Sequence, residues 1–185
     1  MSWKNGGGET TEIAISPAGA GLDDFDWRVS TARVASDGPF SRFPGIERTL
    51  AVLEGAGLHL SIDGRAPILL TSGTEPFAFA GDAHVEAALV GGEIIDLNVM
   101  TRRRRLSHRL NLIEIAGSAK LEATGAETLL YCAEGEMLVQ TLAGLAVLGR
   151  SDALLSSSKG AWHLQAEARA VAYSVEFFAV SSAKR

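Results

Sequence analysis

Hydrophobic residues alternate with polar or small ones along most of this chain, which is the pattern of half-buried β-strands. Residues 12–16 alternate in this way, and residues 25–35 place Trp27, Val29 and Thr31 on one face of a longer strand. Further strands are expected at residues 50–53, 58–62, 68–71, 75–80, 85–90, 94–100 and 171–180. No stretch keeps an apolar period of 3.6 residues, so the pattern predicts an all-β protein with little helix.

Turn residues separate the predicted strands. Asp63-Gly64 stands between two apolar runs and is a strong signal for a tight β-hairpin. Residues 3–9 are predicted to form a loop because they contain three consecutive glycines. The twenty glycines of the chain are more than a helical bundle would tolerate, and they suit a fold with many turns.

The sequence repeats itself at an offset of 80 residues. Residues 127–135 resemble residues 47–55 when Glu134-Gly135 is superposed on Glu54-Gly55. A block of four arginines, residues 102–105, interrupts the strand pattern between the two copies. The repeat predicts two stacked β-barrels, residues 1–105 and residues 106–185, packed as one compact unit. The second copy lacks the turn-rich element found before the strand in the first, so we expect the site in the first barrel.

Composition and charge narrow the class of partner. The net charge of −5 argues against nucleic acid, because phosphate binding requires a basic surface, and the short arginine block is interpreted as a solvated linker. The single cysteine, Cys132, cannot form an intramolecular disulfide, which favours a reducing compartment and a buried structural thiol. The chain start has no signal-peptide core, and no apolar run could span a bilayer. We therefore expect a cytoplasmic protein without a membrane partner, and the composition leaves a homodimer open.

The segment from residue 37 to residue 55 resembles the first motif of the cupin superfamily. In that motif, two His and one Glu precede a strand that ends in Glu-Gly, and together they hold a metal. When the Glu-Gly pairs are superposed, the Glu position falls on Arg48 and the two His positions fall on Ser41 and Phe43. None of the three can act as a metal ligand. The four histidines are dispersed without ligand spacing, so we expect no metal and no other cofactor.

Three further blocks resemble the HutD/Ves family. They are Trp-Lys-Asn-Gly-Gly-Gly at residues 3–8, residues 24–30 followed by 37–41, and Asp-Leu-Asn-Val-Met at residues 96–100. The likeness covers most of the chain and weakens after about residue 105. It implies a compact fold of two cupin-like barrels, a bicupin, and a link to histidine utilisation. It also implies a pocket for a small pathway metabolite, such as a formylated or formimino glutamate, whose binding tempers pathway induction. The family supplies no established catalytic residues.

Arg48 is the leading candidate for ligand binding. A guanidinium where metal-binding cupins place a carboxylate changes the cargo from a cation to an anion, ideally a carboxylate held by two parallel hydrogen bonds. The alternative is that Arg48 points outward or pairs with Glu47 or Asp37. Lys4 and Asn5, in the triple-glycine loop, would add a charge and converging backbone N–H groups. The alternative for them is a flexible terminus.

Polar residues also share strand faces by their period of two: Arg28 with Ser30, and Asp96 with Asn98 and Arg102. Such residues are costly inside a barrel unless they bind each other or a ligand, and an Arg28–Asp96 pair is the alternative to ligand contact. Phe40 and Phe79 would form an apolar wall, with barrel core as the alternative. The residues predicted to bind the ligand are Lys4, Asn5, Arg28, Ser30, Phe40, Arg48, Phe79, Asn98 and Arg102.

These observations predict a metal-free cupin that binds a small anionic metabolite and modulates histidine utilisation, with no catalytic residue assigned. Two other classes stay open. A metal-free isomerase or hydrolase acting on a small carboxylate would need a positioned base. A protein-interaction module without a ligand would show exposed apolar patches.

Overall fold

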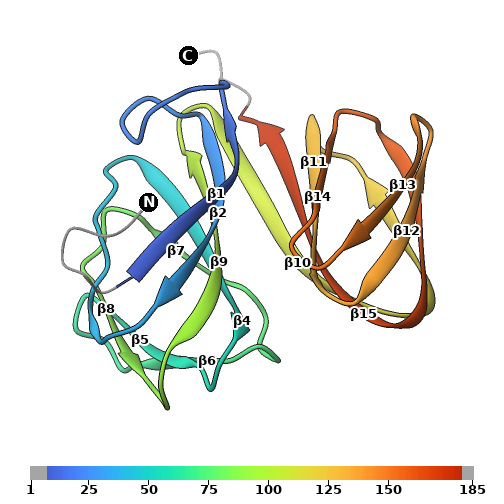
Figure 1. The fold of residues 1–185 in the computed structure, drawn as a ribbon. Coiled ribbons are helices and arrows are strands. Elements are labelled where there is room, and N and C mark those ends of the chain that lie inside the picture. Colours follow the sequence, from blue (N-terminus) through green and yellow to red (C-terminus); the bar gives the residue numbers. More distant parts are fainter. Residues whose placement is uncertain (1–7, 181–185) are drawn as a thin grey trace. The chain divides into compact units, whose positions relative to one another are not determined.

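The computed structural model describes residues 8–180, and every regular secondary-structure element in them is a β-strand. The all-β prediction is therefore confirmed for these residues. None of them belongs to a helix long and apolar enough to cross a membrane. The chain divides into two compact units, Met1–Leu106 and Ser107–Arg185, called unit 1 and unit 2 below (Figure 1). Lys4 and Asn5 lie outside the described residues.

Unit 1 contains two antiparallel sheets that enclose a core. The first has the strand order β1-β2-β9-β4-β7, and the second has the order β3-β8-β5-β6 (Figure 1). The strands of the first sheet are β1 (Gly8–Ser16), β2 (Trp27–Val34), β9 (Ile94–Arg102), β4 (Ile46–Glu54) and β7 (Phe77–Ala80). Those of the second are β3 (Gly38–Pro39), β8 (Val85–Leu89), β5 (Leu58–Ile62) and β6 (Ile68–Leu70). Apolar side chains from both sheets form one cluster, including Leu50, Val52 and Ile94 of the first and Leu58, Leu60 and Val85 of the second. We call the face of the first sheet that enters this cluster its inner face.

Local patterns placed most of these strands correctly. Strand β5 covers residues 58–62 as predicted, and the hairpin between β5 and β6 turns at Asp63 and Gly64. Both turn residues have positive φ, 50° and 70°, as a tight two-residue turn requires. The loop prediction for residues 3–9 is wrong at its end, because β1 already begins at Gly8, which pairs with Val34 of β2. Residues 12–16 alternate in sequence, and pairing with β2 extends the strand from them back to Gly8.

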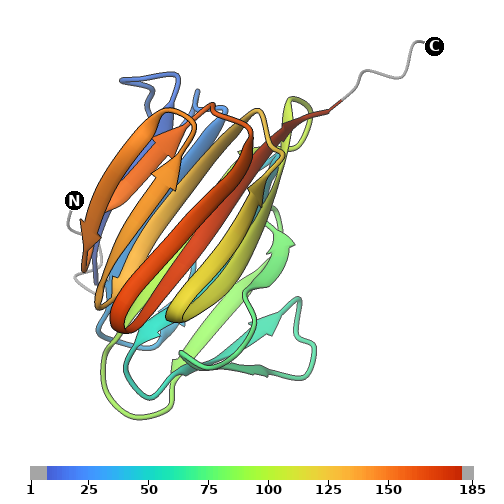
Figure 2. The ribbon, with the colours of Figure 1, turned by 90° about the vertical axis from the view of Figure 1, so that its right-hand side faces the viewer.

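Unit 2 consists of a six-stranded sheet in which the two longest strands lie side by side. Its order is β13-β12-β15-β11-β14, and β10 pairs with β15 (Figure 2). The strands are β10 (Leu106–Ala123), β11 (Glu127–Glu134), β12 (Glu136–Thr141), β13 (Gly144–Gly149), β14 (Ala153–Ser156) and β15 (Gly160–Ala179). Trp162, Leu164 and Leu130 belong to its buried cluster. Cys132 lies there too, as a buried free thiol, in agreement with the prediction.

The predicted repeat has a structural counterpart. The register of β4 against β9 shifts between Val52 and Glu54, which marks a β-bulge. The register of β11 against β15 shifts in the same way between Cys132 and Glu134, 80 residues further along. The two superposed motifs therefore end in the same local irregularity.

The glycine after each bulge meets the neighbouring backbone closely. Gly55 has φ of 95°, and a Cβ atom there would lie 2.6 Å from the carbonyl oxygen of Glu93. Gly135 has φ of 78°, and its Cβ would lie 2.8 Å from the carbonyl oxygen of Arg169. Only glycine adopts such a φ at little cost while leaving room for this approach. Glu93 and Arg169 are therefore structural counterparts in the two units.

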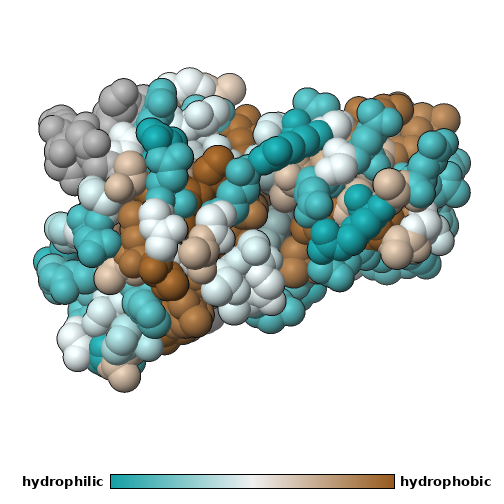
Figure 3. All heavy atoms as spheres, turned by 60° about the horizontal axis from the view of Figure 1, so that its bottom comes forward, coloured by the Kyte–Doolittle hydropathy of each residue, from teal (hydrophilic) through white to brown (hydrophobic). Residues whose placement is uncertain are grey.

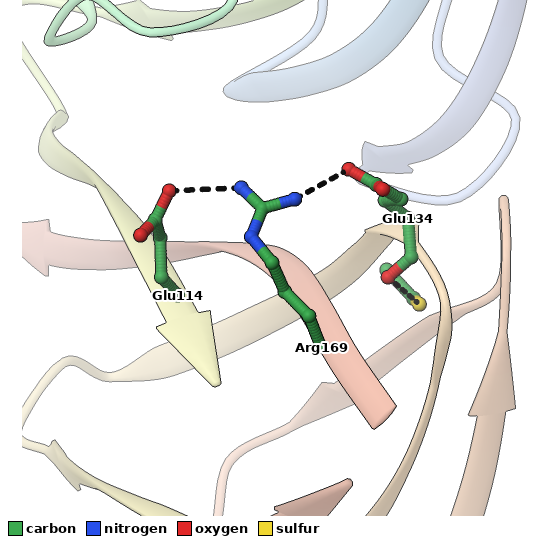
Figure 4. A network of polar contacts seen from close by, with 4 residues as sticks. Glu114, Glu134 and Arg169 are labelled. Carbon is green, nitrogen blue, oxygen red and sulfur yellow. Dashed lines mark hydrogen bonds and ion pairs between the residues drawn. The ribbon is translucent and has the colours of Figure 1, made fainter. Parts of the chain in front are cut away.

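Both counterparts take part in surface ion pairs, although their charges are opposite. In unit 2, Arg169 of β15 bridges Glu114 of β10 and Glu134 of β11, with both contacts at 3.0 Å (Figure 4). In unit 1, Glu93 pairs with Arg33 of β2. All five side chains are largely exposed, so each pair contributes little to stability by itself.

Candidate functional site

Strand β9 lies between β2 and β4, and this arrangement gathers polar side chains on one face. Met100 of β9 pairs with Arg28 on one side and Arg48 on the other. Two residues further along, Asn98 pairs with Ser30 and Leu50, and then Asp96 pairs with Ala32 and Val52. Because cross-strand partners share a face, these polar residues all lie on the inner face. The set, called the polar cluster below, is Arg28, Ser30, Arg48, Asp96 and Asn98, each between 1% and 8% exposed.

The Arg48 guanidinium is buried among aromatic rings. Its Nη1 donates a hydrogen bond to the backbone carbonyl of Ser41 at 3.1 Å, and its Nε has no partner within residues 8–180. The Cζ atom lies 5.4, 5.6 and 5.0 Å from the ring centroids of Phe40, Phe43 and Phe79. These distances permit cation–π attraction. The three positions that the cupin likeness aligned with metal ligands, Ser41, Phe43 and Arg48, therefore meet in space.

Burial makes the Arg48 charge unfavourable. Desolvation lowers the pKa of Arg48 to about 10, and the nearby Asp96 partly opposes this effect. The guanidinium stays charged at neutral pH, since its pKa remains well above 7. An anion that reached the free Nε would therefore compensate a buried positive charge.

Asp96 and Asn98 supply acceptors on the same face. Burial raises the pKa of Asp96 to about 7, while Arg48 and a hydrogen bond from the backbone N–H of Ala32 oppose the rise. Neither Asp96 Oδ1 nor Asn98 Oδ1 has a hydrogen-bond partner in the part of the chain that the structure describes. Buried polar atoms are normally paired, so the unpartnered atoms gathered on this face make it the candidate site.

Arg28 is neutralised from within the sheet. Its Nε bonds Glu12 Oε2 of β1 at 2.8 Å, and its Nη1 bonds Ser30 Oγ at 3.3 Å. The alternative in which Arg28 pairs with Asp96 is therefore wrong. Arg28 and Ser30 lie in the polar cluster as predicted, but both already have partners.

The alternatives for Arg48 are excluded by its surroundings. Its side chain is buried, so it does not point outward. Glu47 lies 3.9 Å from Arg103, and Asp37 accepts a hydrogen bond from the backbone N–H of Leu89 at 2.7 Å. Both carboxylates proposed as partners of Arg48 thus have other contacts.

Arg102 and the arginine block have contacts away from the polar cluster. Arg102 Nε donates to the carbonyl of Phe25 at 3.0 Å, and its Nη2 donates to the carbonyl of Asp23 at 2.9 Å. Arg103 pairs with Asp82, and Arg105 pairs with Asp26. The block is therefore a turn held by ion pairs, and a role of Arg102 in ligand binding stays a prediction.

Two further observations concern a metal site and the protein-interaction class. Within residues 8–180, no group of three His, Cys, Asp or Glu side chains could hold a metal ion. Hydrophobic side chains are also visible at the surface, interspersed with hydrophilic ones (Figure 3). The most exposed large ones are Leu142 at 84%, Leu145 at 67% and Val147 at 62%, on or beside β13, which ends the strand order of its sheet.

Comparison with solved structures identifies the fold class. A cupin 2 conserved barrel domain protein from Leptotrichia buccalis superposes with a TM-score of 0.62 over 95% of this chain and 91% of that chain, at 8% identity. The all-β fold is therefore cupin-like.

Closer likenesses define the family. The HutD family model matches residues 1–173, and the chain belongs to this family, which is associated with histidine utilisation. An uncharacterized 21.2 kDa protein in the hutC 3′ region of Pseudomonas putida is 39% identical over 158 residues, covering 83% of this chain and 80% of that protein.

Two solved structures agree with the family assignment. A conserved protein of unknown function from Pseudomonas aeruginosa PAO1 has a TM-score of 0.90 and 35% identity, over 96% of this chain and 93% of that chain. HutD from Pseudomonas fluorescens SBW25 has a TM-score of 0.81 and 33% identity, over 98% and 94%. The family resemblance inferred from the three sequence blocks is thus confirmed.

Proposed function

We propose that this protein binds a small anionic metabolite on the inner face of unit 1 and thereby modulates histidine utilisation. The observation that carries the proposal is the buried Arg48 guanidinium with its unpartnered Nε. A carboxylate bonded to Nε and a terminal nitrogen would form the bidentate, charge-assisted pair that guanidinium groups favour. Phe40, Phe43 and Phe79 would exclude water around that pair and strengthen it.

Family membership supports the choice of metabolite. Because the family is associated with histidine utilisation, the ligand would be a formylated or formimino glutamate. Such compounds offer carboxylates to Arg48 and nitrogen-bound hydrogens to the acceptors of Asp96 and Asn98. Lys4 would add positive charge at the site and Asn5 polar groups, as the sequence predicts.

Unit 2 would be a degenerate second cupin barrel without this site. Its counterpart of Arg48, 80 residues further along, is Thr128, which pairs with Glu176. Glu176 Oε1 is occupied by the backbone N–H of Thr124 at 2.8 Å, its hydroxyl at 2.8 Å, and the backbone N–H of Gly125 at 3.1 Å. A threonine therefore stands where unit 1 has the buried guanidinium, and the carboxylate opposite it is already bonded, which supports a structural role for this unit.

A thermal-shift titration tests the proposal. N-formyl-L-glutamate, N-formimino-L-glutamate and simple dicarboxylates are titrated to millimolar concentrations. A ligand at about 100 times its Kd stabilises the folded state by roughly 2.7 kcal/mol, so the melting temperature should rise with concentration. The rise should disappear in Arg48→Met and persist in Arg65→Met, which removes the same charge from an exposed turn. The proposal fails if no ligand shifts the melting temperature, or if Arg48→Met retains the shift.

A second readout separates the enzyme alternative. Asp96, with its pKa near 7, is the carboxyl group of the cluster that could act as a base. If proton NMR shows that a bound ligand is converted over hours, and Asp96→Asn abolishes the conversion, the protein is an isomerase or hydrolase. An unchanged ligand supports the binding protein.

The interaction module is the other alternative, and exposed apolar side chains near β13 favour it. It predicts that Leu145→Lys impairs regulation of histidine utilisation in cells. The binding proposal predicts that Arg48→Met impairs it while Leu145→Lys does not.

A further inference from the structure

The polar cluster contains one unpartnered donor and two unpartnered acceptors. Arg48 Nε is the donor, and Asp96 Oδ1 and Asn98 Oδ1 are the acceptors, counted among residues 8–180. The Arg48 guanidinium and the Asp96 carboxyl group shift each other's pKa, yet no ion pair joins them within these residues. A ligand that satisfied all three atoms would be an anion at one end and a hydrogen-bond donor at the other.

The acceptors are arranged along a single strand. Asn98 and Asp96 are two residues apart on β9, so their Cα atoms lie roughly 6 to 7 Å apart along the strand. Asn98 is nearer to the level of Arg48, whose cross-strand partner is Met100. A ligand held at Arg48 would therefore meet Asn98 first and Asp96 at its far end.

The position of Asp96 holds no carboxyl group in unit 2. The pair Val52–Asp96 in β4 and β9 corresponds to the pair Cys132–Ala172 in β11 and β15, since each pair directly precedes the bulge. Alanine therefore stands where unit 1 has a buried carboxyl group. The repeated fold does not require that carboxyl group.

We propose that Asp96 is the specificity-determining residue of the site, and that it selects between a cationic and a neutral nitrogen-bearing end of the ligand. The inference rests on the proposed function, because it needs the carboxylate of the ligand to be held by Arg48. An ionised Asp96 pairs with an amidinium end through a charge-assisted hydrogen bond. A protonated Asp96 donates its hydrogen to the carbonyl oxygen of a neutral amide end. Asn98 accepts from the nitrogen that both ligands share.

The surroundings of Asp96 make this selection dependent on pH. Its pKa of about 7 places the exchange between the two forms near neutrality. The charged group that acts on it is Arg48 of β4, while Arg28 of β2 lies on the same face four residues from Ala32, the partner of Asp96, and is neutralised by Glu12 of β1. The side chains of the second sheet in this core, such as Leu58, Leu60 and Val85, are apolar. Asp96 should therefore be the group whose ionisation changes the preference of the site.

The test compares two ligands of nearly identical shape. N-formimino-L-glutamate carries a cationic amidine where N-formyl-L-glutamate carries a neutral amide, and neither changes its charge between pH 5.5 and pH 8. Dissociation constants for both are measured by calorimetry across this range, with fresh formimino ligand at each pH. The ratio of the formyl constant to the formimino constant cancels any effect of pH that both ligands share.

In the wild-type protein, we expect this ratio to rise at least tenfold from pH 5.5 to pH 8. In Asp96→Asn, which keeps the shape of the side chain but cannot ionise, the ratio should be constant within twofold. Asn98→Ala is the control: it should weaken both ligands and leave the pH dependence of the ratio intact.

Two outcomes would overturn the inference. If both ligands bind, binding is lost in Arg48→Met and the ratio does not change with pH, the proposed function stands but Asp96 is not the selecting residue. If neither ligand binds the wild-type protein at any pH, the proposed function and the inference fail together.

Discussion

Replacement of Arg48 by methionine should leave the ligand-free protein about as stable as the wild type, although a buried side chain is changed. Burial lowers the Arg48 pKa from its ordinary value to about 10, which corresponds to roughly 3 kcal/mol of unfavourable free energy for the charged form. This cost is present in full below the folded-state pKa and decreases as the pH rises above 10. A neutral methionine does not carry it.

The favourable contacts of Arg48 offset most of this cost. Cation–π attraction to Phe40, Phe43 and Phe79 contributes about 0.5 to 1 kcal/mol for each ring. The hydrogen bond to the Ser41 carbonyl contributes about 1 kcal/mol more. The net effect of Arg48→Met should therefore lie within about 1 kcal/mol of zero, and methionine fills the space with a flexible apolar chain.

Arg28→Met is the matched control on the neighbouring strand. Its guanidinium is equally buried but bonded to Glu12 and Ser30, so its loss should destabilise the protein by about 1 to 3 kcal/mol. Both variants are compared with the wild type by urea denaturation at pH 6, where Asp96 is largely protonated. A loss of more than about 2 kcal/mol in Arg48→Met, with an unchanged m-value, would refute the reasoning and make Arg48 a structural anchor.

Three further predictions concern stability. The folded-state pKa of Asp96, about 7, exceeds its unfolded value, so its contribution to stability is complete at low pH and is lost as the pH rises through 7. Asp96→Asn should therefore be more stable than the wild type by a few kcal/mol at pH 8. In urea denaturation this gain should shrink toward pH 5. Gly55→Ala should cost about 2 to 4 kcal/mol, because its Cβ would meet a backbone carbonyl, whereas Gly92→Ala, with φ of 83° and open space, should cost only about 1 kcal/mol; equal losses in denaturant would disprove the close-approach argument. Glu176→Ala should destabilise the protein by roughly 2 to 4 kcal/mol by freeing the donors of residues 124–125, yet leave the ligand-induced thermal shift unchanged.

Local periodicity predicted much of the fold and little of the strand pairing. Strand β5 and the hairpin at Asp63-Gly64 follow from alternation and turn chemistry alone. No local pattern predicts strand β10, because half-buried positions make its alternation irregular over eighteen residues. The full length of β15 was missed as well: only residues 171–180 alternate clearly, while pairing with β12 supports its first half.

The sequence predicts which residues of the candidate site share a strand face, but not how the strands are arranged around it. Alternation placed Arg28 with Ser30 and Asp96 with Asn98, but no local signal shows that β9 lies between β2 and β4. For the same reason no local signal identifies Glu12 as the partner of Arg28, because Glu12 reaches it through the register of β1 on β2. Sequence spacing cannot show that Asp96 Oδ1 lacks a hydrogen-bond partner among residues 8–180, because that depends on every side chain around it.

The bulge and Gly55 also matter for the fidelity of folding. A slip of β9 by one residue against β4 would turn Asp96 and Asn98 away from the core and bring Leu97 and Val99 inward, an exchange between two sets of buried residues. Hydrophobic burial alone distinguishes these alignments poorly, since Leu97 and Val99 would fill the core well. The unpaired residue of the bulge and the tight fit at Gly55 favour the observed alignment. A glycine that lies outside the polar cluster thus contributes to the alignment that places Asp96 and Asn98 on the inner face.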